Sequence, residues 1–508
     1  MIKIKAADFL QDTIWFGLTA LLLLTANLVA AFNGILWKTA VDIMLVAIIV
    51  LNIAICRSLI ANIRRDFALL VFVGAFDLLL LGRVYNSWIG YSHKLLLLLE
   101  AESYPKLFSA LQIVTVSLLC VYLAYRLFGP VFQKRETAIR ERGMGAVLQD
   151  QLTPVIRQIS QIVLYVSSIA FFYTLLKTAL VVLQHGYLSS FTNITDIPGY
   201  ISRLSMFFIP AFAVFLATLP DKKQIRIPLA VYFVYMLASV LTGRRTTLVT
   251  EALMLIVYLV LRDSLLEKEK RVLKKRTVAY AGIFGLAGVY LLQLLALIRA
   301  GLDLGRGFGE MLVSFIDSQG ASFRVIMQTV NHIDLFPAGA SSSYLFYPFE
   351  LFVHNNVATR TLFGLTPIVE VQNSQFVQTT HNFAHVLTYL VDPDRYLSGG
   401  GFGTSFIAES YAAYRIVGVI LLSVMIGLIF RFFASMLTRS WVVIACGLLA
   451  VKNFIYIPRS FAFLWVTEVF NITYLCFFIA IYLAALLVCR MGTHIRSAAP
   501  EPPVGERL

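Results

Sequence analysis

The chain has 508 residues, of which 59% are hydrophobic and only 14% are charged. Soluble globular proteins are closer to half apolar and a quarter charged, so this composition excludes an ordinary soluble domain. Repeated apolar segments of membrane-spanning length indicate instead an all-α polytopic integral membrane protein. The net charge of +14 does not indicate a nucleic-acid partner, because the excess Lys and Arg of such proteins usually lies in cytoplasmic loops.

Apolar segments of spanning length recur along most of the chain. About twelve of them have the ~20 residues that crossing a bilayer requires. The first has no small-residue cleavage site, so we expect it to be retained as a span. The predicted spans are 13–35, 40–60, 66–84, 108–128, 159–183, 204–220, 226–242, 246–262, 278–298, 412–435, 441–457 and 461–488.

The positions of the basic residues predict the orientation of these spans. With the N-terminus in the cytoplasm, short loops on the cytoplasmic side carry most of the Lys and Arg, as the positive-inside rule requires. Both termini are then cytoplasmic. The basic segments on this side are 56–66, 132–143, 221–226, 267–276 and the tail after Cys489.

One connection on the predicted external side is very long. It covers 299–411 and is rich in aromatic residues, which favours short helices packed over the spans. The chain therefore divides into four parts. They are an N-terminal transmembrane bundle of about nine helices at 1–298, the external loop at 299–411, C-terminal transmembrane helices at 412–488 and a cytoplasmic tail at 489–508.

Arginine is frequent on the predicted external side, which membrane proteins normally keep poor in basic residues. Arg can grip phosphate oxygens with two donors and stays charged when partly desolvated. The set favours a cationic pocket for an anionic, phosphorylated substrate, whereas headgroup snorkelling or pairing with local acids is the alternative for any single Arg. Its members are Arg244, Arg245, Arg299, Arg306, Arg324, Arg360, Arg395, Arg415 and Arg459.

Four histidines also lie in the long external connection: His332, His354, His381 and His385. The stretch HNFAH at 381–385 has two His four residues apart but lacks the Glu of an H-E-x-x-H zinc motif. We therefore predict no metal site. A hydrogen-bonding or proton-transfer role for one His and simple packing of a surface helix both stay open.

A Gly-rich segment, SGGGFGTSF at 398–406, leads directly into an apolar span. Glu409 sits at the junction, with Tyr411 and Arg415 close behind. Glycines let a backbone turn tightly and approach a ligand closely, and the missing G-K-[ST] argues against a nucleotide P-loop. Glu409 is a candidate base for a hydroxyl nucleophile, or a helix N-terminal acid stabilised by the dipole.

Several charged residues fall inside apolar runs, where such residues usually face the bundle interior or a water-filled cavity. We expect Lys452 to pair with Glu468 across the last two spans. We expect Glu251 to orient the arginines of the preceding turn, Arg244 and Arg245. The full set is Asp77, Lys177, Glu251, Lys452 and Glu468.

Four segments, taken in order, resemble the bacterial oligosaccharide repeat-unit polymerases, the O-antigen (Wzy-type) polymerase family. The fourth is similar to that family's Gly-Ser-x-x-x-Glu-x-Tyr signature, here ending in Gly418. It reads Tyr-Arg-Ile-Val-Gly where Asn-Phe-Gly is frequent, so Arg415 is expected to be particular to this chain's substrate. The four segments are HGYLSSF at 185–191, LTGRRTTLVTEALMLIVYL at 241–259, IDSQGASFRVI at 316–326 and GGGFGTSFIAESYAAYRIVGV at 399–419.

The resemblance implies a membrane glycosyltransferase of GT-C-like architecture in the bacterial inner membrane. Such an enzyme joins undecaprenyl-diphosphate-linked oligosaccharides at the periplasmic face, with no metal or other cofactor. Its expected partners are the lipid-linked donor and acceptor, membrane lipids and a chain-length regulator protein.

The resemblance also implies roles for individual residues. Arg244, Arg245 and Arg459 are expected on the diphosphate, assisted by Arg299, Arg324 or Arg360. Glu409 leads as the group that activates the acceptor, with His354 and His381 as second choices. Sugar and loop contacts are expected from Tyr411, Arg415 and His385.

Two other functions stay open beside the one that the resemblance implies. A related ligase that transfers finished glycan to a lipid A core shares the large periplasmic loop and the Arg-rich site. A lipid-linked oligosaccharide flippase or proton-coupled transporter also uses about twelve spans with buried charges. Transporters usually show two related halves, and the single long external loop makes this chain asymmetric.

Overall fold

The structure is a computed structural model, and its described residues form helices and loops with no strand among them. They comprise 6–32, 36–91, 104–130, 152–185, 197–242, 245–266, 271–273, 285, 288, 290, 307–337 and 341–498.

Nine helical segments in the described part are long and apolar enough to cross a membrane. Each coincides with a predicted span, which confirms the all-α polytopic class. The helices involved are α1 (Ala6–Ala31), α2 (Trp37–Ile60), α3 with η1 and α4 (Ile63–Phe76, Asp77–Leu81, Gly82–Trp88), α5 (Tyr104–Leu127), α8 (Thr153–His185), α10 with α11 (Gly199–Ser205, Phe208–Ala217), α22 (Phe406–Phe433), α23 with η9 (Trp441–Tyr456, Ile457–Arg459) and α24 with α25 (Leu464–Val469, Ile472–Ala498).

The other three predicted spans differ from these nine. α12 (Arg226–Ser239) with η4 (Val240–Thr242) is apolar but shorter, and α13 (Arg245–Leu265) carries more polar residues. The predicted span at 278–298 lies almost entirely outside the described residues, so the count of twelve stays a prediction.

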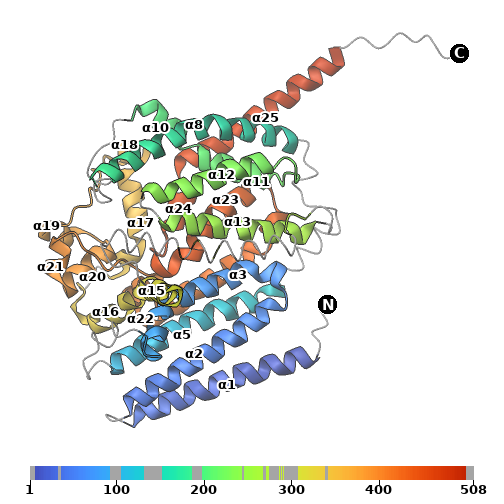
Figure 1. Cartoon of the computed structure of the whole chain (residues 1–508). Helices are drawn as coiled ribbons and strands as arrows, with labels where there is room; N and C mark the ends of the chain where they lie inside the picture. The colour runs from blue at the N-terminus through green and yellow to red at the C-terminus, as the bar shows by residue number, and fades with distance from the viewer. Residues whose placement is uncertain are drawn as a thin grey trace.

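The long helices lie side by side, with α1 and α2 along one margin of the bundle and α8 and α25 along the other (Figure 1). α22 packs against α5, and α23 packs against α11 and α13. Rings fill the centre, where the Phe430 centroid lies 4.7 Å from that of Phe72 and 6.1 Å from that of Phe454.

The α5–α22 contact depends on a glycine. A Cβ added at Gly427 would lie 2.3 Å from the Val121 carbonyl oxygen and 2.8 Å from the Ala124 Cβ. Only a residue without a side chain permits this approach, because a packed interior cannot absorb an extra methyl group without shifting backbone.

Gly427→Ala is therefore expected to lower the free energy of unfolding by about 1–3 kcal/mol. Gly74→Ala on α3 is the matched control, because no heavy atom lies within 4 Å of its Cβ position; alanine's helix propensity should leave that variant unchanged or slightly more stable. Thermal unfolding in detergent measures both. Equal melting temperatures for the two variants would contradict the prediction, because they would mean that the α5–α22 contact accommodates an added methyl group without loss of stability.

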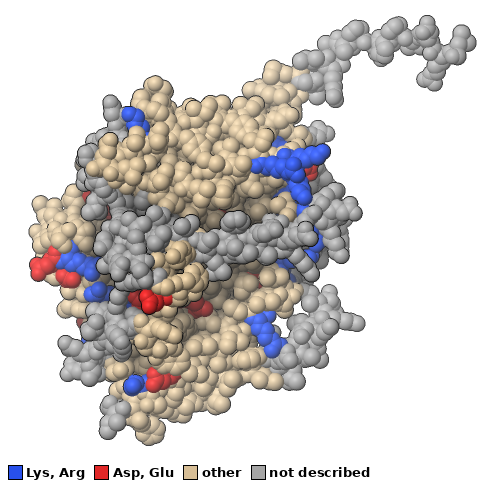
Figure 2. Space-filling view, viewed as in Figure 1, with Lys and Arg blue, Asp and Glu red and all other residues tan. Residues whose placement is uncertain are grey.

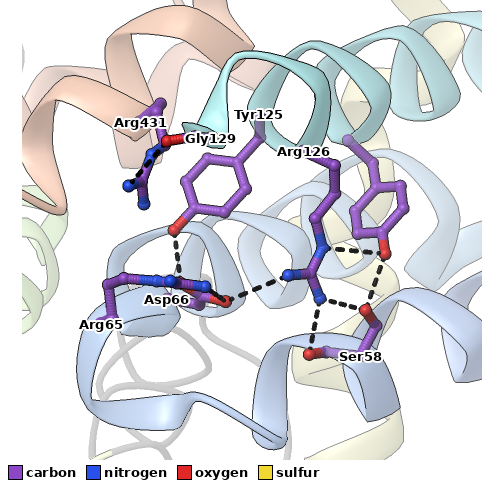
Figure 3. A network of polar contacts seen from close by, with 8 residues as sticks. Ser58, Arg65, Asp66, Tyr125, Arg126, Gly129 and Arg431 are labelled. Carbon is purple, nitrogen blue, oxygen red and sulfur yellow. Dashed lines mark hydrogen bonds and ion pairs between the residues drawn. The ribbon is translucent and has the colours of Figure 1, made fainter. Parts of the chain in front are cut away.

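A buried polar network joins α2, α3 and α5 at one end of the bundle, and Arg431 of α22 lies beside it, 5.7 Å from the Tyr125 ring centroid (Figure 3). Asp66 is fully buried and accepts hydrogen bonds from Tyr125 at 2.7 Å and from Arg65 at 2.6 Å. Arg126 donates to the Ser58 carbonyl at 2.7 Å and lies 3.7 Å from the Asp66 carboxylate. Buried charge is tolerated when it is paired and hydrogen-bonded in this way, so the network fixes α2, α3 and α5 relative to one another.

The opposite end of the bundle carries a layer of short helices, here called the cap and defined as described residues 307–405. It packs on α4, α5, α22 and α24, as the aromatic-rich connection predicted. Its helices are α15 (Phe308–Gln319), η6 (Gly320–Ser322), α16 (Phe323–Asn331), η7 (Ile333–Leu335), α17 (Ser341–Asn355), α18 (Val357–Phe363), α19 (Ser374–Thr379), α20 (Phe383–Val391) and α21 (Pro393–Leu397).

Four of the cap helices begin at a local side-chain cap. The side chains of Asn356, Asn373, Asn382 and Asp392 accept backbone N–H groups at the starts of α18, α19, α20 and α21, as helix N-caps do. Gly364 ends α18 in the left-handed conformation. In Figure 2, Lys, Arg, Asp and Glu gather toward the two ends of the bundle, and uncharged surface lies between them.

Candidate functional site

Glu409 lies in the first turn of α22, where the cap meets the bundle, and its side chain is fully buried. One carboxylate oxygen accepts a hydrogen bond from the Thr404 hydroxyl, and the other accepts the Ala462 backbone N–H at 2.9 Å. Glu409 thus ties the Gly-rich segment to the turn between α23 and α24.

Two glycines shape the segment that leads into α22. Gly399 and Gly403 have φ angles of 85° and 79°, in the left-handed region that residues with a Cβ rarely adopt. The Phe402 N–H between them donates to the Thr388 hydroxyl on α20 at 3.1 Å. The Gly-rich segment is therefore a folded turn held against α20.

Two arginines converge on the ring of Phe402. The guanidinium carbon of Arg324, on α16, lies 4.4 Å from the ring centroid, and that of Arg395, on α21, lies 4.9 Å from it. Burial and then the like charge of Arg395 lower the pKa of Arg324. The buried Nε of Arg324 has no hydrogen-bond partner among the described residues.

A third cation comes from the bundle. Arg83 on α4 donates to the Asp317 carbonyl at 3.0 Å and lies 3.4 Å from the Asp317 carboxylate, and its charge also lowers the pKa of Arg324. A Cβ at Gly320 would lie 2.1 Å from the Arg83 backbone nitrogen. Glycine at 320 therefore allows the cap to dock closely enough to bring Arg83 toward Arg324.

The other predicted diphosphate ligands have mixed placements. Arg459 ends η9, three residues before the Ala462 that binds Glu409, and is half-buried. Arg360 is on α18, and no contact brings its side chain to Arg324. Arg244 and Arg299 lie outside the described residues. Arg245 begins α13, but its side chain lies outside them too.

The three predicted histidines have different partners. His381 Nδ1 lies 2.8 Å from a carboxylate oxygen of Glu350 on α17. His354 Nδ1 lies 2.8 Å from the Thr366 carbonyl. His385 Nδ1 lies 3.0 Å from the Tyr396 hydroxyl, and burial lowers the pKa of its imidazole.

A second carboxylate, that of Glu370, lies next to His381, because it binds the neighbouring residue Asn382. Glu370 accepts hydrogen bonds from the Tyr347 hydroxyl at 2.7 Å and from the Asn382 amide at 2.6 Å. Burial and the Glu370 carboxylate raise the pKa of Tyr347, so it stays a neutral donor. The ring of Tyr347 lies 6.1 Å from that of Phe461, beside Ala462.

The predicted sugar contacts Tyr411 and Arg415 lie together where α22 is broken. Arg415 has φ of 52° inside the helix, and its guanidinium lies 3.4 Å from the exposed Asp334 carboxylate and 5.9 Å from the Tyr411 ring centroid. The third predicted sugar contact, His385, lies on α20 of the cap instead.

The predicted pairing of Lys452 with Glu468 is wrong. Lys452 Nζ lies 2.9 Å from a carboxylate oxygen of Glu251 on α13, and the other Glu251 oxygen accepts the Tyr232 hydroxyl at 2.6 Å. Glu251 is therefore occupied by Lys452 and Tyr232, and nothing described supports the expectation that it orients the preceding arginines. Both groups lie in apolar helices, where a charge without a partner is costly.

Arg83, Glu350, Glu370 and Thr404 belong to this site but were not predicted as site residues, and Arg395 was not singled out as a ligand. Arg395 stood out only as one of nine external arginines, and the two glutamates carried no signal in the sequence. Among the described residues, no group of three or more His, Cys, Asp or Glu side chains is arranged to hold a metal ion.

The helical bundle and its cap define a multi-pass membrane protein that gathers arginines, histidines and carboxylates at one end. A family model described as O-antigen polysaccharide polymerase Wzy matches residues 14–491, nearly the whole chain. The chain belongs to this family, and so to the O-antigen repeat-unit polymerases that act on lipid-linked oligosaccharides. No curated protein and no solved structure matches it.

Proposed function

We propose that the chain is a metal-independent glycosyltransferase that joins undecaprenyl-diphosphate-linked oligosaccharides. One observation carries this proposal: Arg324 and Arg395 converge on Phe402, next to Thr404 and Glu409. The Asp392 carboxylate offsets part of the positive charge that Arg395 and Arg83 place around Arg324, and a diphosphate would neutralise the rest.

In this reaction the diphosphate leaves from the anomeric carbon of the growing chain. Negative charge develops on the departing oxygen, and fixed guanidinium groups stabilise it without a metal. Arg324 and Arg395 are the primary ligands. Arg83, whose charge acts on Arg324, assists them, and Arg459 stays proposed as a further ligand from the turn that holds Glu409. Arg244, Arg245, Arg299 and Arg360 stay proposed as additional ligands.

A groove beside the break in α22 suits the lipid part of the substrate. It has a volume of about 420 Å³ and is lined by residues of α1, α2, α5 and α22, among them Leu23, Met44, Leu119, Tyr411 and Ile416. These side chains are mostly apolar, as a polyprenyl chain requires. Tyr411 and Arg415 would then contact the first sugars, with His385 contacting sugars from the cap.

The cap end is proposed to face the periplasm, and the Asp66 end the cytoplasm, in the bacterial inner membrane. The positive-inside rule supports this orientation, because the short loops rich in Lys and Arg join the helices at the Asp66 end. Both termini are then cytoplasmic. A separate chain-length regulator is proposed as a protein partner in addition to membrane lipids.

The direct test incubates purified protein with a lipid-linked repeat unit, in the absence of nucleotide and with a chelator present. A ladder of multimers on the lipid is the expected product. Transfer only to an added lipid A core would instead identify a ligase. Translocation across vesicles without any new glycosidic bond would identify a transporter.

A further inference from the structure

We propose that the His381–Glu350 dyad takes the proton from the acceptor hydroxyl, and that Glu409 is a positioning residue. This inference rests on the proposed function, because it assigns the acceptor side of the same site. It selects among Glu409, His354 and His381, the three candidates that the sequence left open.

Glu409 is poorly placed to act as the base. A general base must come within hydrogen-bond reach of the proton that it removes. The Glu409 side chain is 0% exposed, and its two oxygens already accept the Thr404 hydroxyl and the Ala462 N–H. These bonds hold the Gly-rich segment and the 460–463 turn together, which is a positioning role.

The dyad has the exposure and the geometry that Glu409 lacks. The His381 side chain is 35% exposed and that of Glu350 is 33% exposed, with 2.8 Å between Nδ1 and the carboxylate oxygen. Because a carboxylate accepts, the bond places the neutral imidazole's proton on Nδ1 and leaves the lone pair on Nε2. A carboxylate that orients a histidine and stabilises its protonated form is the arrangement of known general-base dyads.

The other two histidines of the site are less suited to this role. His354 Nδ1 faces a backbone carbonyl, which fixes the ring but adds no negative charge to stabilise an imidazolium. His385 faces the Tyr396 hydroxyl, and burial lowers the pKa of its ring, which makes it a weaker base.

Two series of contacts, one through α17 and one through α20, connect the dyad to the rest of the site. On α17, Phe346 precedes Glu350 by one turn and stacks on Phe463 at 5.5 Å, next to the Ala462 that holds Glu409. On α20, Asn382 follows His381 and caps the helix.

The contacts through α20 reach Arg324 and Arg395. Thr388, on the same short helix, binds the backbone of Phe402 at 3.1 Å. The ring of Phe402 contacts both Arg324 and Arg395. The base and the anion site are therefore parts of the same cap.

The bond changes balance with this assignment. The acceptor oxygen forms a bond to the anomeric carbon of the donor chain, and the bond from that carbon to the diphosphate oxygen breaks. The electron pair stays on the diphosphate, whose charge the arginines stabilise. The acceptor proton moves to His381 Nε2, Glu350 stabilises the imidazolium, and the proton then passes to solvent.

The test compares four variants in the ladder assay. His381→Ala is expected to lower kcat by about 100- to 10,000-fold, as loss of a general base does, with little change in KM for the lipid-linked unit. Added imidazole is expected to restore part of the rate. Glu350→Gln is expected to lower kcat less than His381→Ala does, and His332→Ala, a cap histidine outside the site, is the matched control.

The Glu409→Gln variant tests whether Glu409 acts as a general base or as a positioning residue. The amide oxygen of the new side chain can accept the Ala462 N–H while its NH₂ donates to the Thr404 hydroxyl, so the positioning bonds survive but the capacity to act as a base is lost. We expect this variant to retain polymerisation within about 10-fold of the wild type, since a base would cost at least about 100-fold.

Two results would overturn the assignment. One is a His381→Ala variant that keeps its activity, or that loses it with no rescue by imidazole. The other is a folded Glu409→Gln variant with no activity. If the wild-type protein makes no ladder at all, the proposed function itself fails. A wild-type ladder with either of the first two results rejects the dyad alone.

Discussion

Replacing Arg324 by alanine is expected to lower the polymerisation rate by about 100- to 1,000-fold, the usual cost of removing one donor that stabilises a developing anion. Its half-buried guanidinium faces Phe402 and Arg395 and has a buried Nε without a partner among the described residues. Arg324→Lys should recover only part of the rate, because an ammonium group lacks the two-donor fork that fits a phosphate. The ladder assay at saturating substrate measures the rate.

Arg203→Ala is the matched control, because Arg203 is exposed on α10, outside the cap. Its polymerisation rate should equal that of the wild type. In the double variant Arg324→Ala with Arg395→Ala, the losses should not add, because both arginines act on one group. Strictly additive losses, or full activity of Arg324→Ala, would mean that the two arginines do not share a ligand.

Removing Glu251 is expected to produce the largest loss of stability, about 3–5 kcal/mol in the free energy of unfolding, because a nearly buried Lys452 is left without its counter-charge. The Glu251 side chain is 2% exposed and that of Lys452 is 18% exposed. Glu251→Ala also removes the acceptor of the Tyr232 hydroxyl. Thermal or denaturant unfolding in detergent measures the change.

A double variant, Glu251→Gln with Lys452→Met, should recover most of that stability, because replacing both charges leaves neither one unpaired. Asp334→Ala serves as the control, since it breaks an exposed ion pair with Arg415 whose contribution should be below about 1 kcal/mol. If the single and double variants are equally unstable, the ion pair is not what stabilises the α13–α23 contact.

The apolar segments predicted the membrane-spanning helices well, because length and hydropathy are properties of a continuous stretch of chain. Side-chain partners were harder to predict. Lys452 was assigned to the nearby Glu468, but its partner is Glu251, which lies 201 residues earlier in the chain. That choice depends on which helices become neighbours, and periodicity within a single helix carries no information about this.

In the candidate site, too, the position of a residue along the chain was predictable and its side-chain partners were not. Glu409 was singled out because it lies where a Gly-rich segment enters an apolar span, and the structure does place it where cap and bundle meet. Its burial could not be read from the sequence, since Ala462, 53 residues away, contributes a backbone N–H. Likewise, Glu350 could not be singled out in the sequence. Its only distinguishing feature is the contact with His381, which depends on α17 packing beside the start of α20.

The break in α22 has a mechanical consequence. At Tyr414 and Arg415 the backbone leaves the helical conformation, so α22 consists of two helical segments joined at a kink. The longer helical segment is packed on α5 through Gly427 and moves with the lipid-embedded bundle. The shorter helical segment, with Glu409, is attached to the Gly-rich segment and the 460–463 turn. If the bundle tilts as lipid thickness varies, we expect the change of angle to fall at residues 414–415, with the hydrogen bonds of Glu409 retained.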